Sequence, residues 1–313
     1  MSSGRLLLFL VLAALVALGI FGYGDFKETG RQLADFPLSH FLAALALAAL
    51  NYLLRFLRWS YYLRVLAIRV PLGASSLIFL SGLAMSVTPA KAGEVLKCYL
   101  LRDRRGLEIF RTLPVVLMER LTDLAAVVAL ALIGMALLPV PLVAVLAGVL
   151  AVCFLVLLAV FFTRGRRLFD LPLVRRWKSG LTVSQDALRE LARPGALAVA
   201  LALAAAAWLS EGLALWVILT GLDASLDIHR VLPIYAAATL VGALTTLPGG
   251  LIGTEGSMLA LLQQSGIARG PASASTILVR LATLWFAVAV GLAALAWLNR
   301  RGAYRQTSPG DRG

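Results

Sequence analysis

Charged residues are scarce in this sequence. Asp, Glu, Lys and Arg make up 14% of the 313 residues, whereas 60% are hydrophobic. Such a composition leaves too little polar surface to cover a water-soluble protein of this size. An ordinary soluble fold is therefore excluded.

Cysteine and histidine are almost absent, with two residues of each. Cys98 and Cys153 lack CxxC spacing, and His40 and His229 lie far apart in the sequence. Neither a disulfide framework nor a His/Cys metal site is predicted from such a pattern.

Catalytic motifs are missing as well, since the sequence has no GxSxG elbow and no HExxH motif. The glycine-rich stretch 249–256 lacks the Gly-Lys-Ser/Thr ending of a phosphate-binding loop. The paired carboxylates Glu119 and Asp123 flank Arg120, which favours ion pairing over acid–base chemistry. We expect no enzymatic activity, no catalytic residue and no cofactor.

Acidic residues are outnumbered: 29 Lys and Arg against 16 Asp and Glu give a formal net charge of +13. Proteins that bind nucleic acids also carry such an excess. Here, however, the basic residues lie mostly between apolar runs, where they set the orientation of a membrane protein. We expect no nucleic-acid partner.

Long apolar runs are what the sequence has in abundance. None alternates with the period of a barrel strand, and several reach the roughly twenty residues that a helix needs to cross a bilayer. The sequence predicts an all-α polytopic membrane protein, with 1–313 as one integral membrane domain. Six full spans are predicted, at 5–23, 38–66, 112–138, 142–163, 195–221 and 272–298. The first lacks a cleavage site, so we expect it to be retained.

Basic residues predict the orientation, because Lys and Arg beside spans favour the cytoplasmic side. They gather at Arg64 and Arg69, at 102–105, along the connection 164–194 and in the tail 299–313. Both termini are therefore expected in the cytoplasm, with the protein in the inner (cytoplasmic) membrane. The 164–194 connection, in which apolar residues are interleaved, fits an interfacial helix or a plain loop equally well.

Two apolar stretches, 73–100 and 231–265, must begin and end on one side of the membrane if this orientation holds. Each is broken by Pro and Gly, which remove a backbone donor and permit a reversal. The residues expected to form the two tips are Pro89, Gly93, Pro248, Gly249, Gly250 and Gly253. We predict two re-entrant hairpins of opposite polarity, the pattern typical of secondary transporters. Two ordinary kinked helices are the alternative.

Polar and ionisable residues recur inside the apolar segments, where charges are costly and usually face a cavity or each other. Helical spacing puts several on shared faces, and Glu211 and Arg280 lie within the fifth and sixth spans. Each alone could pin helices together, but as a set they favour a site for a charged headgroup or a coupled ion. The candidate substrate-binding residues are Asn51, Arg55, Arg58, Lys91, Glu94, Lys97, Glu119, Arg120, Asp123 and Glu255.

Four segments carry recognisable motifs: residues 51–59 (NYLLRFLRW), 88–97 (TPAKAGEVLK), 119–123 (ERLTD) and 247–255 (LPGGLIGTE). In this order they resemble the flippase-like membrane family related to the transmembrane region of lysylphosphatidylglycerol synthase. The resemblance implies translocation of a lipid, such as an aminoacylated phospholipid; other relatives are linked to polyprenyl-phosphate sugars or hopanoid lipids. The aminoacyl-transferase domain of some relatives is not expected here.

Two departures from the family pattern are visible. Lys91 and Lys97 stand where Arg is often found, which keeps the charge but loses the bidentate fork. Gly253 falls one position later than in the pattern.

We predict a lipid translocase in which Glu94 and Glu255 meet near mid-membrane while the basic residues receive an anionic headgroup. Membrane lipids with a charged headgroup are the expected partners. One alternative is a non-transporting protein that docks a glycosyltransferase or lipid-synthesising enzyme through the 164–194 connection. Another is an intramembrane enzyme that acts on a lipid phosphate.

Overall fold

The computed structural model describes residues 26–88, 94–134, 178–245 and 247–306, position 19 and scattered positions between 140 and 155. Within these ranges the chain folds into helices and contains no strand, which confirms the predicted helical class. The predicted span 5–23 lies outside the described residues except for position 19, and only scattered positions of 142–163 are described. Pro89 and Gly93 of the first predicted tip, and the candidate site residue Lys91 between them, also lie outside the described residues.

Among the described residues, three helical segments are long and apolar enough to cross a bilayer. They are α3 (Leu38–Val65), α9 (Pro194–Gly221) and the continuous run of α12 (Arg269–Arg280), η6 (Leu281–Trp285) and α13 (Phe286–Gln306). These match the spans predicted at 38–66, 195–221 and 272–298. A fourth long helix, α6 (Ile109–Ile133), covers most of the span predicted at 112–138 and carries three ionised residues near its middle.

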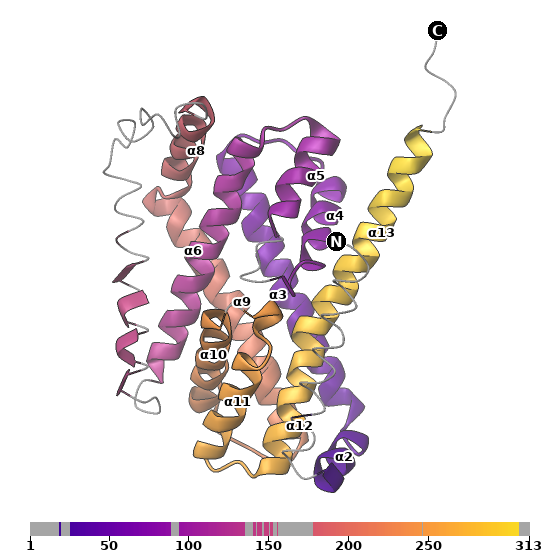
Figure 1. Cartoon of the computed structure of the whole chain (residues 1–313), viewed down its shortest axis with the longest axis vertical. Coiled ribbons are helices and arrows are strands. Elements are labelled where there is room, and N and C mark those ends of the chain that lie inside the picture. Colours follow the sequence, from indigo (N-terminus) through magenta and orange to yellow (C-terminus); the bar gives the residue numbers. More distant parts are fainter. Residues whose placement is uncertain are drawn as a thin grey trace.

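Helices α3 and α9 pack along each other more extensively than any other pair. Both helices carry fully buried alanines, Ala44 and Ala48 on α3 and Ala200 and Ala204 on α9. Ala44 belongs to the same apolar cluster as Leu215 and Ile218 of α9, whereas Ala48 belongs to a cluster with Leu83 and with Ala287 of α13. This pair forms the central scaffold of the molecule (Figure 1).

Two pairs of short helices lie at opposite ends of the molecule (Figure 1). The first hairpin consists of α4 (Leu72–Leu83) and α5 (Leu96–Arg105), and the second of α10 (Ile228–Leu244) and α11 (Gly253–Gln264). At about 1.5 Å per residue these helices are roughly 15 to 26 Å long, shorter than a hydrocarbon core of about 30 Å. The stretches 73–100 and 231–265 therefore each contain a pair of short helices.

The tip of the second hairpin is a short 3₁₀ turn, η5 (Pro248–Gly250). Gly249 and Gly250 have φ angles of +64° and +67°, in the left-handed region that favours glycine. Pro248, Gly249 and Gly250, three of the residues expected at this tip, form the turn, whereas Gly253 begins α11.

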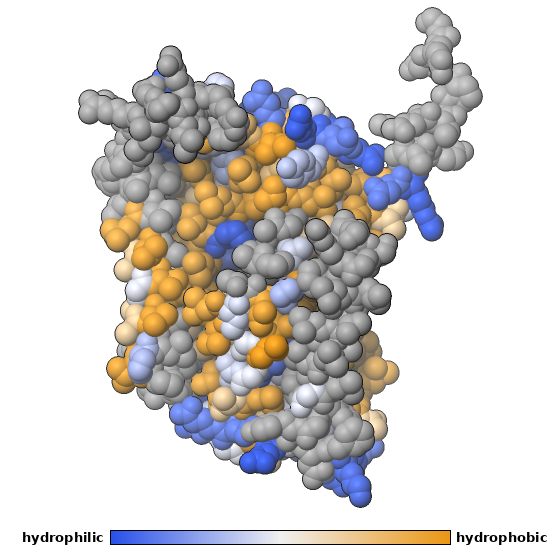
Figure 2. Space-filling view, viewed as in Figure 1, coloured by the Kyte–Doolittle hydropathy of each residue, from blue (hydrophilic) through white to orange (hydrophobic). Residues whose placement is uncertain are grey.

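The remaining described helices lie at the periphery. Helix α2 (Phe26–Ala34) packs against α12, and α8 (Lys178–Leu191) packs against α6. The Ser184 hydroxyl donates a hydrogen bond to the Phe110 carbonyl oxygen at 2.6 Å. The described part of the 164–194 connection is therefore a helix that rests on the protein itself. Figure 2 shows hydrophobic residues over the middle of the molecule and hydrophilic ones at both ends, as a bilayer requires.

Gly291 brings α13 against the backbone of the first hairpin. A Cβ atom at this position would overlap the backbone nitrogen of Ala84, which cannot move aside as a flexible side chain can. We expect Gly291→Ala to destabilise the protein by about 1–3 kcal/mol, the usual range for overpacking. Thermal unfolding in detergent would measure this. The matched control is Gly256→Ala on α11, where open space surrounds the added methyl group; equal melting temperatures for the two variants would contradict the contact.

Candidate functional site

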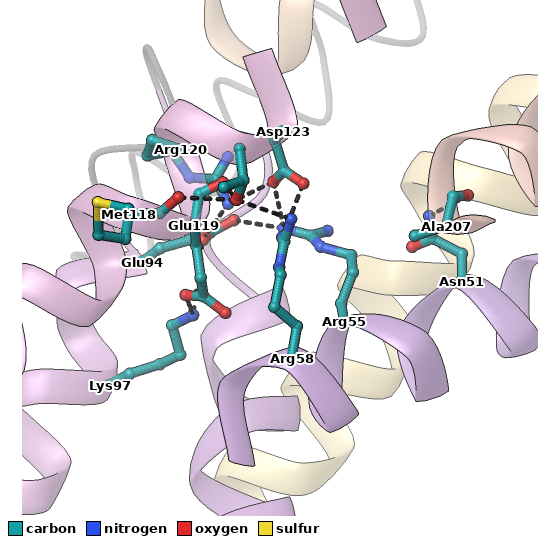
Figure 3. A network of polar contacts seen from close by, with 11 residues as sticks. Asn51, Arg55, Arg58, Glu94, Lys97, Met118, Glu119, Arg120, Asp123 and Ala207 are labelled. Atoms are coloured by element: carbon teal, nitrogen blue, oxygen red, sulfur yellow. Dashed lines mark hydrogen bonds and ion pairs between the residues drawn. The ribbon is translucent and has the colours of Figure 1, made fainter. Parts of the chain in front are cut away.

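Seven ionised side chains from α3, α6 and the start of the first hairpin's second helix converge on one point (Figure 3). We call them the charged network: Arg55, Arg58, Glu94, Lys97, Glu119, Arg120 and Asp123. All seven were candidates from the sequence. Four cations face three carboxylates, so the network has an excess of one positive charge.

Glu94 joins the first hairpin to both long helices of the network. Its Oε1 lies 3.2 Å from Nη2 of Arg55, and its Oε2 pairs with Arg120 and lies 3.7 Å from Nζ of Lys97. Only 2% of the residue is exposed. Because a buried carboxylate is stable only with cationic partners, Glu94 holds these three cations together.

Asp123 makes the corresponding contacts on α6. Its carboxylate lies 2.7 Å from Arg58, 3.5 Å from Arg120 and 3.7 Å from Arg55. Arg58 is fully buried and also donates to the Thr122 hydroxyl at 3.1 Å. The Arg58–Asp123 pair therefore fixes α3 against α6.

Lys97 and Glu119 form the most enclosed pair, with Nζ and Oε2 2.6 Å apart and side chains 3% and 2% exposed. The ammonium group also lies 4.6 Å from the centre of the Trp59 ring and 5.3 Å from that of Phe79. Such contacts stabilise a desolvated cation. Neither residue of the pair lines the cavity described below.

Asn51 lies apart from the network, and Figure 3 shows its side chain next to Ala207. Its amide donates to the Ala207 carbonyl oxygen at 2.8 Å, a contact that ties α3 to α9.

The second hairpin has an ion pair of its own. Glu255, in the first turn of α11, forms an ion pair with Arg280, with Oε1 and Nε 2.6 Å apart. Arg280 also donates through Nη2 to the Gly249 carbonyl oxygen at 2.6 Å. The hairpin tip is thereby attached to α12. Glu94 and Glu255 thus pair with different arginines.

A cavity of about 320 Å³ lies between the two hairpins. Ser86 and Thr88 reach it from the first hairpin, and Gly249 and Gly250 from the second. Four charged groups of the ion pairs line it: Arg55, Arg120, Asp123 and Arg280. Its volume falls within the range of small-ligand sites, so it can hold a small polar group but not a long hydrocarbon chain.

The rest of the cavity wall is largely apolar or aromatic, and most of it could not be selected from the sequence. It includes Tyr52, Leu124, Val127, Trp208, Tyr235, Leu240 and Leu284. Tyr52 donates to the Thr283 carbonyl oxygen at 2.8 Å and Tyr235 donates to Glu211 at 2.9 Å. For Tyr52 a signal existed, since it precedes Arg55 by three residues and so shares its helix face.

Among the described residues, no three His, Cys, Asp or Glu side chains are grouped to hold a metal ion. The acidic groups of the network instead accept from arginine and lysine.

Comparison with known proteins identifies the family. Residues 6–291 match the family described as the lysylphosphatidylglycerol synthase TM region. Two proteins named UPF0104 membrane protein, both from Methanothermobacter thermautotrophicus, are similar: one is 26% identical over 128 residues, the other 27% identical over 220 residues. The matched regions cover 41% and 64% of this chain, and 38% and 66% of the relatives' own lengths. With all but its ends matched, the chain belongs to the lysylphosphatidylglycerol synthase transmembrane-region family and is a multi-pass membrane protein.

Proposed function

We propose that this protein moves a lipid with a charged headgroup between the two leaflets of a membrane. The observation that carries the proposal is the cavity between the two hairpins, which is lined by arginines of two ion-pair systems and by apolar side chains. A headgroup crossing the hydrocarbon core needs such polar partners, because an unpaired charge there is costly.

The charge balance favours an anionic group on the headgroup. The charged network carries one positive charge in excess, and Arg55 and Arg120 present guanidinium groups to the cavity. Guanidinium groups bind phosphate through two parallel hydrogen bonds. A lipid phosphate could therefore bind without removing the carboxylates that hold the arginines.

The placement in the membrane belongs to the same proposal. We take the two hairpins as re-entrant segments of opposite polarity, with the binding site between their tips. The last turns of α3 and α5, which carry Arg64 and residues 102–105, lie at one end of the molecule (Figure 1), which we place in the cytoplasm with both termini. The inner membrane is the corresponding location.

The test is leaflet exchange of labelled phospholipids in proteoliposomes of the pure protein. Exchange is expected for wild-type protein, and Glu94→Gln and Glu255→Gln should each slow it by about tenfold, because each loss releases an arginine that lines the cavity. Glu190→Gln, on α8, where the side chain is 45% exposed and does not line the cavity, is the matched control and should exchange lipid at the wild-type rate.

Normal exchange in folded Glu94→Gln and Glu255→Gln proteins would refute the site. No exchange by folded wild-type protein for anionic, zwitterionic or aminoacylated lipids would refute translocation of these lipids. The docking role of the 164–194 connection would then be tested by co-purification of a lipid-modifying enzyme.

A further inference from the structure

Glu211 is the one carboxylate lining the cavity that has no ion-pair partner among the described residues. The other lining carboxylate, Asp123, contacts three arginines. For Glu211, a half-buried residue of α9, the described contact is the Tyr235 hydroxyl, which donates to Oε2 at 2.9 Å.

A purely structural role explains the hydrogen bond but not the charge. A glutamine would accept the same bond from Tyr235 without placing a negative charge inside the molecule. Arg55 lies within electrostatic range of Glu211, but no described cation forms an ion pair with it. A carboxylate without a paired cation is costly at membrane depth, and residues of this kind usually mark a pathway or a ligand site.

Aromatic side chains surround the same part of the cavity. Trp208 precedes Glu211 by three residues and so shares its helix face, and Tyr52 and Tyr235 also line the cavity. A carboxylate together with aromatic rings is a favourable environment for a small cation. The other ionisable groups lining this cavity are Tyr52 and Arg55 from α3, Arg120 and Asp123 from α6, Tyr235 from α10, and Arg280 from α12.

The charges around the cavity therefore form two groups of opposite net charge, which we call the positive and the negative pole. The charged network has an excess of one positive charge, the Glu255–Arg280 pair is balanced, and Glu211 adds one negative charge. The ligand that neutralises both poles carries one negative and one positive charge.

We infer that Glu211 is a cation-binding subsite, placed to receive a small cation while the arginines receive the phosphate of the same lipid. This rests on the proposed function and adds the class of headgroup. The cation is either an ammonium group of the headgroup itself or a free alkali ion that accompanies an anionic headgroup.

Equilibrium binding to the full-length protein in detergent tests the subsite without requiring transport. The probes are phosphatidylethanolamine, its N-acetylated form, which keeps the phosphate but loses the cation, and phosphatidylglycerol. Wild-type protein should bind phosphatidylethanolamine about tenfold more tightly than the N-acetylated lipid, and Glu211→Gln should reduce this preference to less than about twofold. Glu190→Gln should keep the wild-type preference.

Sodium identifies the source of the cation. If wild-type protein binds phosphatidylglycerol several-fold more tightly in sodium than in N-methylglucamine and Glu211→Gln does not, the subsite holds a free alkali ion. If neither the amine nor sodium changes binding in a way that depends on Glu211, the subsite is refuted. Translocation is judged separately by leaflet exchange of the wild-type protein, so the two proposals can fail independently.

Discussion

Replacing Glu119 by glutamine should lower the free energy of unfolding by about 3–5 kcal/mol, because the variant buries a lysine without its nearest anion. In the wild type Nζ of Lys97 lies 2.6 Å from Glu119, and the next carboxylate, that of Glu94, is 3.7 Å away. The ammonium group of Lys97 cannot be hydrated instead, because its side chain is only 3% exposed and the rings of Trp59 and Phe79 lie against it.

The double variant Lys97→Met, Glu119→Gln should recover most of the loss, since it removes both charges and methionine adapts to the space of the lysine stem. Unfolding in mixed micelles of the wild type, both single variants and the double variant gives the coupling energy directly. Glu190→Gln controls for loss of a partly exposed carboxylate. Additive effects of the two single variants would show that the pair is not coupled in the way its geometry indicates.

Replacing Arg120 by glutamine should slow leaflet exchange by about a hundredfold. Arg120 lines the cavity with a side chain 26% exposed, whereas Arg58 in the same network is fully enclosed. Loss of one or two charge-assisted hydrogen bonds to a phosphate corresponds to about 3 kcal/mol, or roughly two orders of magnitude. Arg120→Lys should fall between the two, because it keeps the charge and loses the fork.

Folding should tolerate the change of Arg120, since Glu94 keeps contacts with Arg55 and Lys97, and Asp123 keeps Arg55 and Arg58. Arg104→Gln, at the exposed end of α5, controls for loss of a basic residue. Exchange within twofold of the wild type in folded Arg120→Gln protein would exclude Arg120 from the headgroup site.

The helices and the members of the charged network could be predicted from the sequence, because the patterns that indicate them are local. Hydropathy placed α3 and α9 within one residue at each end, and Pro with Gly marked the turn of the second hairpin. Intramembrane charge identified the members of the network, since charges inside apolar segments must find one another.

The residues that line the cavity could not be predicted in this way. Glu211 indicates which face of α9 points inward, but the rest of the helix is apolar, so its sequence does not show which of its apolar or aromatic residues, such as Trp208, line the cavity. The contact between Glu211 and Tyr235 depends on how α9 is aligned with α10, a non-local property. Asn51 illustrates a related limit: it shares a face with Arg58, but seven residues separate them by roughly 10 Å along α3, so Asn51 meets α9 and Arg58 meets α6.

The two hairpins also affect the electrostatic potential inside the cavity, through the directions of their helix dipoles. A hairpin tip joins the carbonyl end of one helix to the amide end of the next, so the backbone macrodipoles of α10 and α11 oppose each other there, as do those of α4 and α5. The potential at the tips is then set by a few side chains rather than by the backbone. For the proposed lipid site, changes at those side chains should therefore alter which headgroup charge is preferred while the fold stays the same.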